Sequence, residues 1–97
     1  MFELTTMQRK FLRAEAHALK PVVMIGNAGL SEPVLLEISR ALAAHELIKI
    51  RVFNDNRAER EAWLAEVCAK SDCAPVQHIG KLLVVYKPAE EPRLKLP

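Results

Sequence analysis

Aromatic residues and cysteines are scarce in this chain of 97 residues. Aromatics make up 5% of the sequence, so any platform for stacking nucleic-acid bases must be very small. Cys68 and Cys73 are too few for the disulfide framework of a small secreted protein. No histidine stands at zinc-ligand spacing from them. We therefore expect reduced thiols in or near the core, and no metal site.

Long apolar runs are also missing. No stretch approaches the roughly eighteen residues that a membrane helix needs. The first twenty residues hold charged side chains between Glu3 and Glu15, so they contain no signal-peptide apolar core. The formal net charge of +2 permits a nucleic-acid partner without indicating one. We expect a cytoplasmic protein with no membrane partner.

A catalytic set is the third absence. His17, His45 and His78 are scattered, and a metalloprotease helix starting at His45 would need its second histidine where Lys49 stands. The acids between residues 59 and 66 alternate with basic and apolar residues, which is typical of a solvated helix face. We expect no enzyme, no cofactor and no small-molecule substrate.

Helix and strand patterns alternate along the rest of the chain. Thr5 and Gln8 match a capping box that begins a helix, and Lys20-Pro21 ends it. Apolar residues spaced three or four apart predict the buried face of this helix; they are Leu4, Met7, Phe11, Ala14 and Ala18. The later segments are a strand at 22–25, a helix begun by Ser31, a strand at 47–53, a helix at 57–70 and a hairpin around Gly80-Lys81.

This order, αβαβαββ, predicts a single small α+β domain over residues 1–88. A strand-helix-strand unit gives a parallel pair and the hairpin an antiparallel one, so the four-stranded sheet is mixed and has helices packed on it. Residues 89–97 are rich in proline and predict a loose tail. In the strand at 47–53, Ile48, Ile50 and Val52 share one face. Lys49 and Arg51 share the other, and the pattern does not tell whether a helix covers them.

The segment "KPVVMIGNAGLS" (residues 20–31) is the strongest candidate for a functional site. An apolar strand runs into Gly26, Asn27, Ala28 and Gly29 and then at once into a helix start. Glycine permits positive φ and close approach of another backbone. The main-chain amides of the turn and of the helix N-terminus favour an anion. KH-type modules clamp a nucleic-acid backbone with such a GxxG loop. Alone, the spacing also fits an ordinary strand-to-helix turn.

Basic residues near the loop in sequence, and on the first helix, favour the binding hypothesis. Lys20 precedes the strand that leads to the loop, and Arg40 is on the outer face of the helix that leaves it. A stripe without acids is predicted on the first helix, formed by Arg9, Lys10 and Arg13. The alternative is a protein-interaction module that docks on a partner protein through Leu36, without direct contact to nucleic acid.

Three motifs, in order and spacing, resemble the CRM domain (chloroplast RNA splicing and ribosome maturation), in its stand-alone bacterial YhbY-type form. They are "LKPVVMIGNAGLSEPVLLEISRAL", "HELIKIRV" and "QHIGKLLVVYK". The resemblance runs from about Leu4 to Lys87. It implies an RNA-binding domain with a fold similar to the C-terminal domain of translation initiation factor three.

The resemblance also implies a role. Stand-alone bacterial members are associated with precursors of the large ribosomal subunit and are thought to assist its assembly. The expected partners are therefore large-subunit rRNA or its precursor, within the pre-ribosomal particle. In the alternative of a protein-interaction module, the protein docked through Leu36 is a ribosomal protein, and there is no direct RNA contact. The family's GxxG loop falls on residues 26–29 and its preceding lysine on Lys20.

Overall fold

The computed structural model describes residues 3–97, and its elements follow the expected order. They are α1 (Thr6–Ala16), β1 (Val23–Ile25), α2 (Glu32–His45), β2 (Leu47–Val52), α3 (Arg57–Ser71), β3 (Ala74–Ile79) and β4 (Leu82–Tyr86). The predicted α+β class and mixed four-stranded sheet are confirmed.

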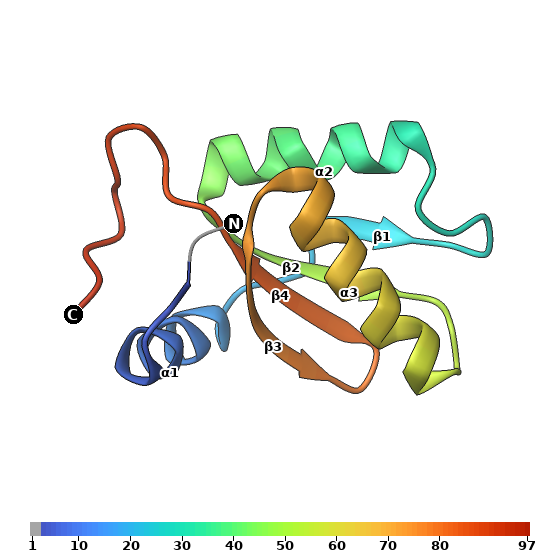
Figure 1. Ribbon diagram of the computed structural model, residues 1–97, viewed down its shortest axis with the longest axis horizontal. Coiled ribbons are helices and arrows are strands. Elements are labelled where there is room, and N and C mark those ends of the chain that lie inside the picture. Colours follow the sequence, from blue (N-terminus) through green and yellow to red (C-terminus); the bar gives the residue numbers. More distant parts are fainter. Residues whose placement is uncertain (1–2) are drawn as a thin grey trace.

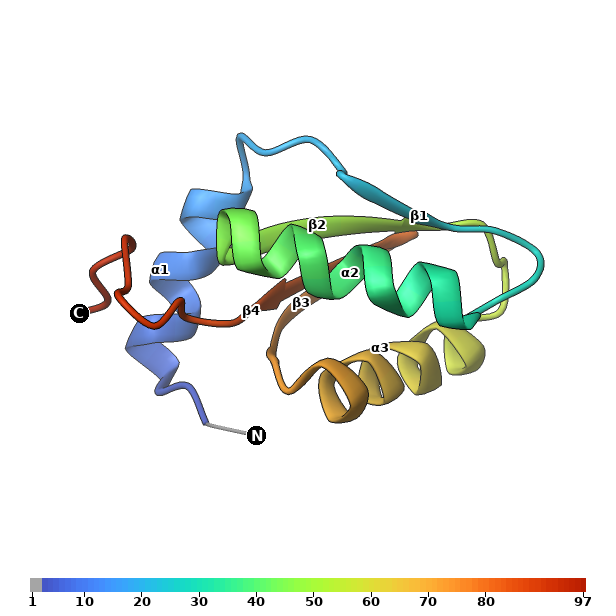
Figure 2. The same ribbon diagram turned by 90° about the horizontal axis from the view of Figure 1, so that it is seen from above.

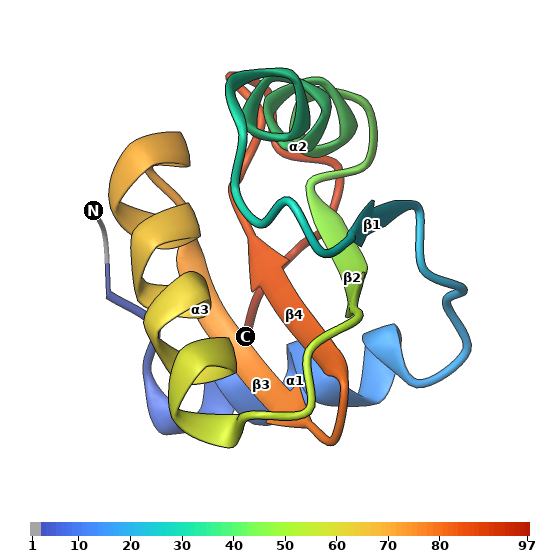
Figure 3. The same ribbon diagram turned by 90° about the vertical axis from the view of Figure 1, so that its right-hand side faces the viewer.

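The sheet has the strand order β1-β2-β4-β3. β1 pairs with β2 in parallel, and the other two pairs are antiparallel. Helices α2 and α3 lie on one face of the sheet and α1 on the other (Figures 1 and 3). The molecule therefore has three layers, with the sheet between α1 on one side and α2 and α3 on the other. Each face of the sheet has its own hydrophobic cluster.

The larger cluster lies between the sheet and the pair α2 and α3. It contains Ile48, Ile50 and Val52, as the alternation along β2 predicts. Cys68 and Cys73 are free, buried thiols in the same cluster. The opposite side of β2 starts at Leu47, which belongs to the cluster under α1.

The predicted buried face of α1 is wrong in part. Thr5 and Gln8 do form a capping box, with both hydrogen bonds at 3.0 Å. The buried residues of the helix, however, are Leu12 and Ala16, which lie one turn apart, whereas Met7 is 67% exposed. The helix also ends before Ala18. Of the predicted residues, Leu4 is buried and Phe11 packs against the cluster under α1, so the spacing identified only part of the buried face.

The tail is held against the domain, which contradicts the expectation of a loose segment. The carboxylate of Glu46, buried between α2 and β2, accepts backbone hydrogen bonds from Ala89 and Arg93 (both 2.9 Å) and from Leu94 (3.2 Å). Leu94 and Leu96 pack against the cluster under α1. A buried carboxylate needs donors, and the tail supplies them. The sequence pattern shows proline and charge in the tail but not this distant acceptor.

Candidate nucleic-acid interface

The loop between β1 and α2 is a tight turn built around Gly29. The amide of Gly29 donates to the carbonyl of Gly26 (3.0 Å), and Gly29 has φ +74°, a conformation that favours glycine. A Cβ at residue 29 would lie 3.4 Å from Cζ2 of Trp63. The positive φ of the turn therefore favours glycine at residue 29, whereas the ring of Trp63 on α3 leaves room for a Cβ in ordinary contact.

Gly26 has no such requirement. Its φ is not in the left-handed region, and a Cβ built on it would meet no atom within 4 Å. Residue 26 is exposed. The absence of a side chain here leaves open space beside the main chain, which is the condition for another backbone to approach closely.

Only some of the main-chain amides of residues 26–30 are available to an anion. The amide of Gly29 is used within the turn, and just beyond this stretch that of Ser31 donates to the carbonyl of Gly29 (3.0 Å). Within the part of the chain that the structure describes, the amides of Asn27, Ala28 and Leu30 have no hydrogen-bond acceptor. Those three groups are free to donate to a ligand.

The start of α2 adds further donors. Ser31 occupies the N-cap position, as predicted, but its side chain makes no capping hydrogen bond. The first amides of a helix have no partner inside it, and the helix dipole favours an anion there. Glu32, in the first turn, is an exposed acid that offsets part of this effect.

Lys20 and Arg40 lie at different distances from the loop. Arg40 is exposed on α2, about 12 Å along the helix axis from Glu32. Lys20 lies before the amino end of β1, whereas the loop follows its carboxyl end. Lys20 borders a groove that it shares with the end of α2 and the tail, including His45 and Arg93.

The cations of α1 do not converge on the loop. Figures 1 and 2 show α1 and the loop at opposite ends of the molecule's long axis. Arg9 is half-buried and its Nε donates to the carbonyl of Pro75 (3.3 Å), so it ties α1 to β3. Lys10 and Arg13 are exposed and form no ion pair among residues 3–97.

Lys49 and Arg51 lie on the face of the sheet that carries α1. Arg51 is exposed, and Lys49 is half-buried with its Nζ donating to the carbonyl of Leu19 (3.0 Å). Helix α1 covers only part of this face, so Arg51 is not beneath a helix. The alternation along β2 placed the two residues on one face; which helix covers that face depends on the tertiary fold.

In residues 3–97, no group of three or more His, Cys, Asp or Glu side chains is placed to hold a metal ion. Over the same residues, no helix is long and apolar enough to cross a membrane.

Known proteins resemble this chain along nearly its whole length. A family model described as the CRS1 / YhbY (CRM) domain matches residues 4–87, the same part of the chain as the motifs above. A Haemophilus influenzae protein named RNA-binding protein is 44% identical over 97 residues, which are 100% of this chain and 98% of that protein. A probable RNA-binding protein of Bacillus subtilis is 38% identical over 89 residues, covering 91% of this chain and 92% of that one.

The fold has a counterpart among solved structures. The solution structure of a Staphylococcus aureus protein, described as a candidate RNA-binding protein, matches with a TM-score of 0.86 at 30% identity. The match covers 98% of this chain and 100% of that one.

Proposed function

Because the chain belongs to the CRS1 / YhbY (CRM) domain family, as its motifs predicted, we propose that it is an RNA-binding protein that captures the RNA backbone at the loop of residues 26–29. The names of its relatives support RNA as the ligand. The observation that carries the proposal is the open position at Gly26, beside three amides without acceptors.

In this proposal the free amides of the loop and the first amides of α2 hold one phosphate. Arg40 neutralises a phosphate farther along the strand, and Lys20 another. Contacts of this kind position RNA but carry little sequence information. If about five phosphates are neutralised in all, the logarithm of affinity falls with the logarithm of salt at a slope of about −3.5 for single-stranded RNA.

The test is a double variant of the loop, Asn27→Asp with Ala28→Asp. Both residues are exposed, so the fold is retained, while two negative charges oppose a phosphate at this position. We expect at least tenfold weaker binding of a fluorescein-labelled single-stranded RNA, measured by anisotropy, with an unchanged melting curve. The matched control is Ala62→Asp with Ala65→Asp, two exposed positions of α3 that receive the same charge.

Equal affinity of the loop variant and the α3 control contradicts backbone capture at the loop. The protein-docking alternative predicts that equality, together with an affinity for its partner that barely depends on salt. Leu36, the residue it relies on, is 51% exposed on α2.

We also propose the cellular setting that the family resemblance implies. The protein acts in the cytoplasm on precursors of the large ribosomal subunit and assists their assembly. On a sucrose gradient of cell lysate we expect the protein to sediment with immature large subunits, and the loop double variant to remain at the top. Crosslinking on those particles then identifies the RNA segment.

A further inference from the structure

On the face of the sheet that carries α1, the helix leaves part of the surface uncovered. This uncovered part lies between the loop and α1. One row of paired residues crosses all four strands there. Met24 pairs with Arg51, Arg51 with Leu82, and Leu82 with Ile79. Arg51 and the two end residues of this row are exposed, Met24 by 58% and Ile79 by 53%. We call these four residues the open row.

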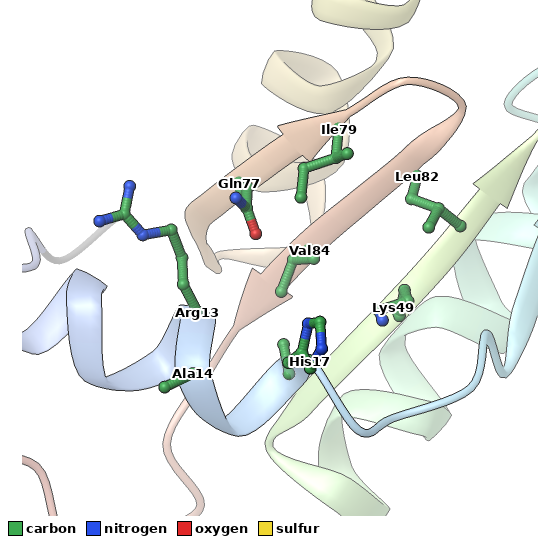
Figure 4. Close-up of a pocket in the computed structure, with 9 residues that line it drawn as sticks. Arg13, Ala14, His17, Lys49, Gln77, Ile79, Leu82 and Val84 are labelled. Atoms are coloured by element: carbon green, nitrogen blue, oxygen red, sulfur yellow. The ribbon is translucent and has the colours of Figure 1, made fainter.

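The open row continues into a groove of about 280 Å³ beside α1. Its floor is Val84 of β4 and its walls include Lys49 of β2 and His17 at the end of α1 (Figure 4). Arg13 of α1 also lines it, and no acid does. Asp55, near the hairpin, is neutralised by Lys81 at 2.6 Å. The uncovered surface thus combines apolar side chains with unopposed positive charge.

We propose that the open row and this groove form a second contact surface for single-stranded RNA, continuous with the loop. The inference rests on the proposed function and extends it to the path of the strand. Charge complementarity selects the occupant: Arg13, Lys49 and Arg51 suit phosphates, and a surface with cations and no lining acid favours a polyanion over a typical protein partner.

The apolar residues of the row suit bases. Four strands spaced about 4.8 Å apart give a row about 14 Å wide. In RRM domains two or three bases stack on aromatic side chains of a four-stranded sheet. The open row offers Met24, Leu82 and Ile79 for apolar contact with bases in place of aromatic rings. Arg51 lies 5.4 Å from the centroid of the Phe53 ring, so a guanidinium plane and one ring stand at the edge of the row. Both groups stack on bases.

Continuity with the loop comes from the chain itself. Met24 is two residues before Gly26, on the strand that delivers the loop. A single-stranded RNA that is held at residues 26–29 and crosses the open row reaches Arg13 and Lys10 at the far end of the molecule. The distant cations of α1 then belong to the same RNA path, although they cannot share a phosphate with the loop.

The test compares oligouridylates of two lengths. A GxxG loop holds about four nucleotides, so a tetranucleotide occupies the loop alone and one about three times longer also reaches the open row. We expect Arg51→Ala to weaken the longer probe about fivefold, to leave the tetranucleotide unchanged, and to make the salt slope less steep by about 0.7. Met24→Ser with Ile79→Ser is also expected to weaken binding of the longer probe and to leave that of the tetranucleotide unchanged, but without changing the salt slope.

Arg57→Ala is the matched control, since Arg57 is an exposed cation on α3, on the other side of the sheet. Arg51→Lys keeps the charge and loses the stacking plane, so it is expected to retain the salt slope and lose part of the affinity. Amide shifts of residues 24, 51, 79 and 82 on addition of the longer probe to the unaltered protein give a second readout that needs no variant.

The two proposals fail in different ways. In one outcome, the loop double variant binds both probes more weakly, the Arg51 and Met24/Ile79 variants bind like the control, and the four amides do not shift. The open row is then not an RNA surface, and the loop proposal stands. If no variant changes either probe, the loop proposal fails as well. If the Arg51 and Met24/Ile79 variants keep their RNA affinity but lose binding to a protein, the open row is a protein-binding surface instead.

Discussion

Gly29 lies beside the indole of Trp63, so the loop and α3 meet at this pair of residues. Residue 29 has φ +74°, and a side chain there would begin 3.4 Å from the ring. Two glycines of one motif therefore have separate roles: Gly29 forms the turn, and Gly26 leaves the space above it open.

The first prediction separates these roles. Gly29→Ala places an L side chain in the left-handed region, which costs about 1–2 kcal/mol. For a domain of this size each kcal/mol lowers Tm by roughly 4–8 °C, measured by thermal unfolding. Gly26→Ala is expected to keep the Tm of the unaltered protein but to bind RNA several-fold more weakly. A lowered Tm for Gly26→Ala and not for Gly29→Ala would reverse the assignment.

The second prediction concerns Trp63, the one tryptophan in the sequence. It is half-buried and lies beside Gly29 of the loop, so we expect RNA bound at residues 26–29 to change its surroundings. We expect the emission of Trp63 to change on titration with RNA, with a midpoint that matches the anisotropy measurement. The loop double variant is expected to lose the change in parallel with affinity. A constant emission at saturating RNA argues against binding at the loop.

The third prediction distinguishes two cations of α1. Arg9 donates to the carbonyl of Pro75, whereas Arg13 is exposed and lines the groove. Arg9→Ala is expected to cost about 1 kcal/mol of stability because it removes a hydrogen bond between α1 and β3. Arg13→Ala is expected to leave Tm unchanged and to weaken binding of the longer RNA. Thermal melting and RNA-binding anisotropy of these two variants, which have equal charge, distinguish a structural role of Arg9 from an RNA-binding role of Arg13.

The fourth prediction is a pH dependence that arises at Glu46. Burial raises the pKa of Glu46, but hydrogen bonds from the amides of Ala89, Arg93 and Leu94, and from the Arg93 side chain, outweigh burial and hold the pKa below its ordinary value. A carboxylate with a depressed pKa stabilises the fold above the unfolded-state pKa, and this stability is lost as pH falls through the folded-state pKa. The tail is therefore expected to detach in acid, once the pH falls below the ordinary pKa of a glutamate carboxyl group.

Glu46→Gln tests this prediction. The variant keeps the shape and loses the charge, so Tm at pH 7 is expected to fall by an amount equivalent to about 1–3 kcal/mol. The loss of stability between pH 5 and pH 3 is expected to be smaller than in the unaltered protein. Glu90→Gln, an exposed acid of the tail, serves as the control and should melt like the unaltered protein at every pH. Identical acid profiles for both variants would exclude Glu46 as the origin.

Local patterns predicted the elements well, and long-range contacts explain what they missed. The alternation of Ile48, Ile50 and Val52 identifies the core face of β2, because a strand has only two sides. A helix has many stripes, so the apolar spacing of α1 selected one that includes exposed Met7. The loop motif was visible in sequence, but the distance between the loop and α1 depends on which face of the sheet α1 covers.

The bonds that Glu46 accepts also bear on how the domain folds. They join residues that are 43 to 48 positions apart, so a large loop must close before any of them forms. We infer that this carboxylate stays hydrated through most of the folding reaction and is dehydrated only after the transition state, when the tail docks. Loss of its charge should then leave the refolding rate nearly unchanged and accelerate unfolding. The hydrogen bonds between Glu46 and the tail thus affect the unfolding rate of the native state more than its folding rate.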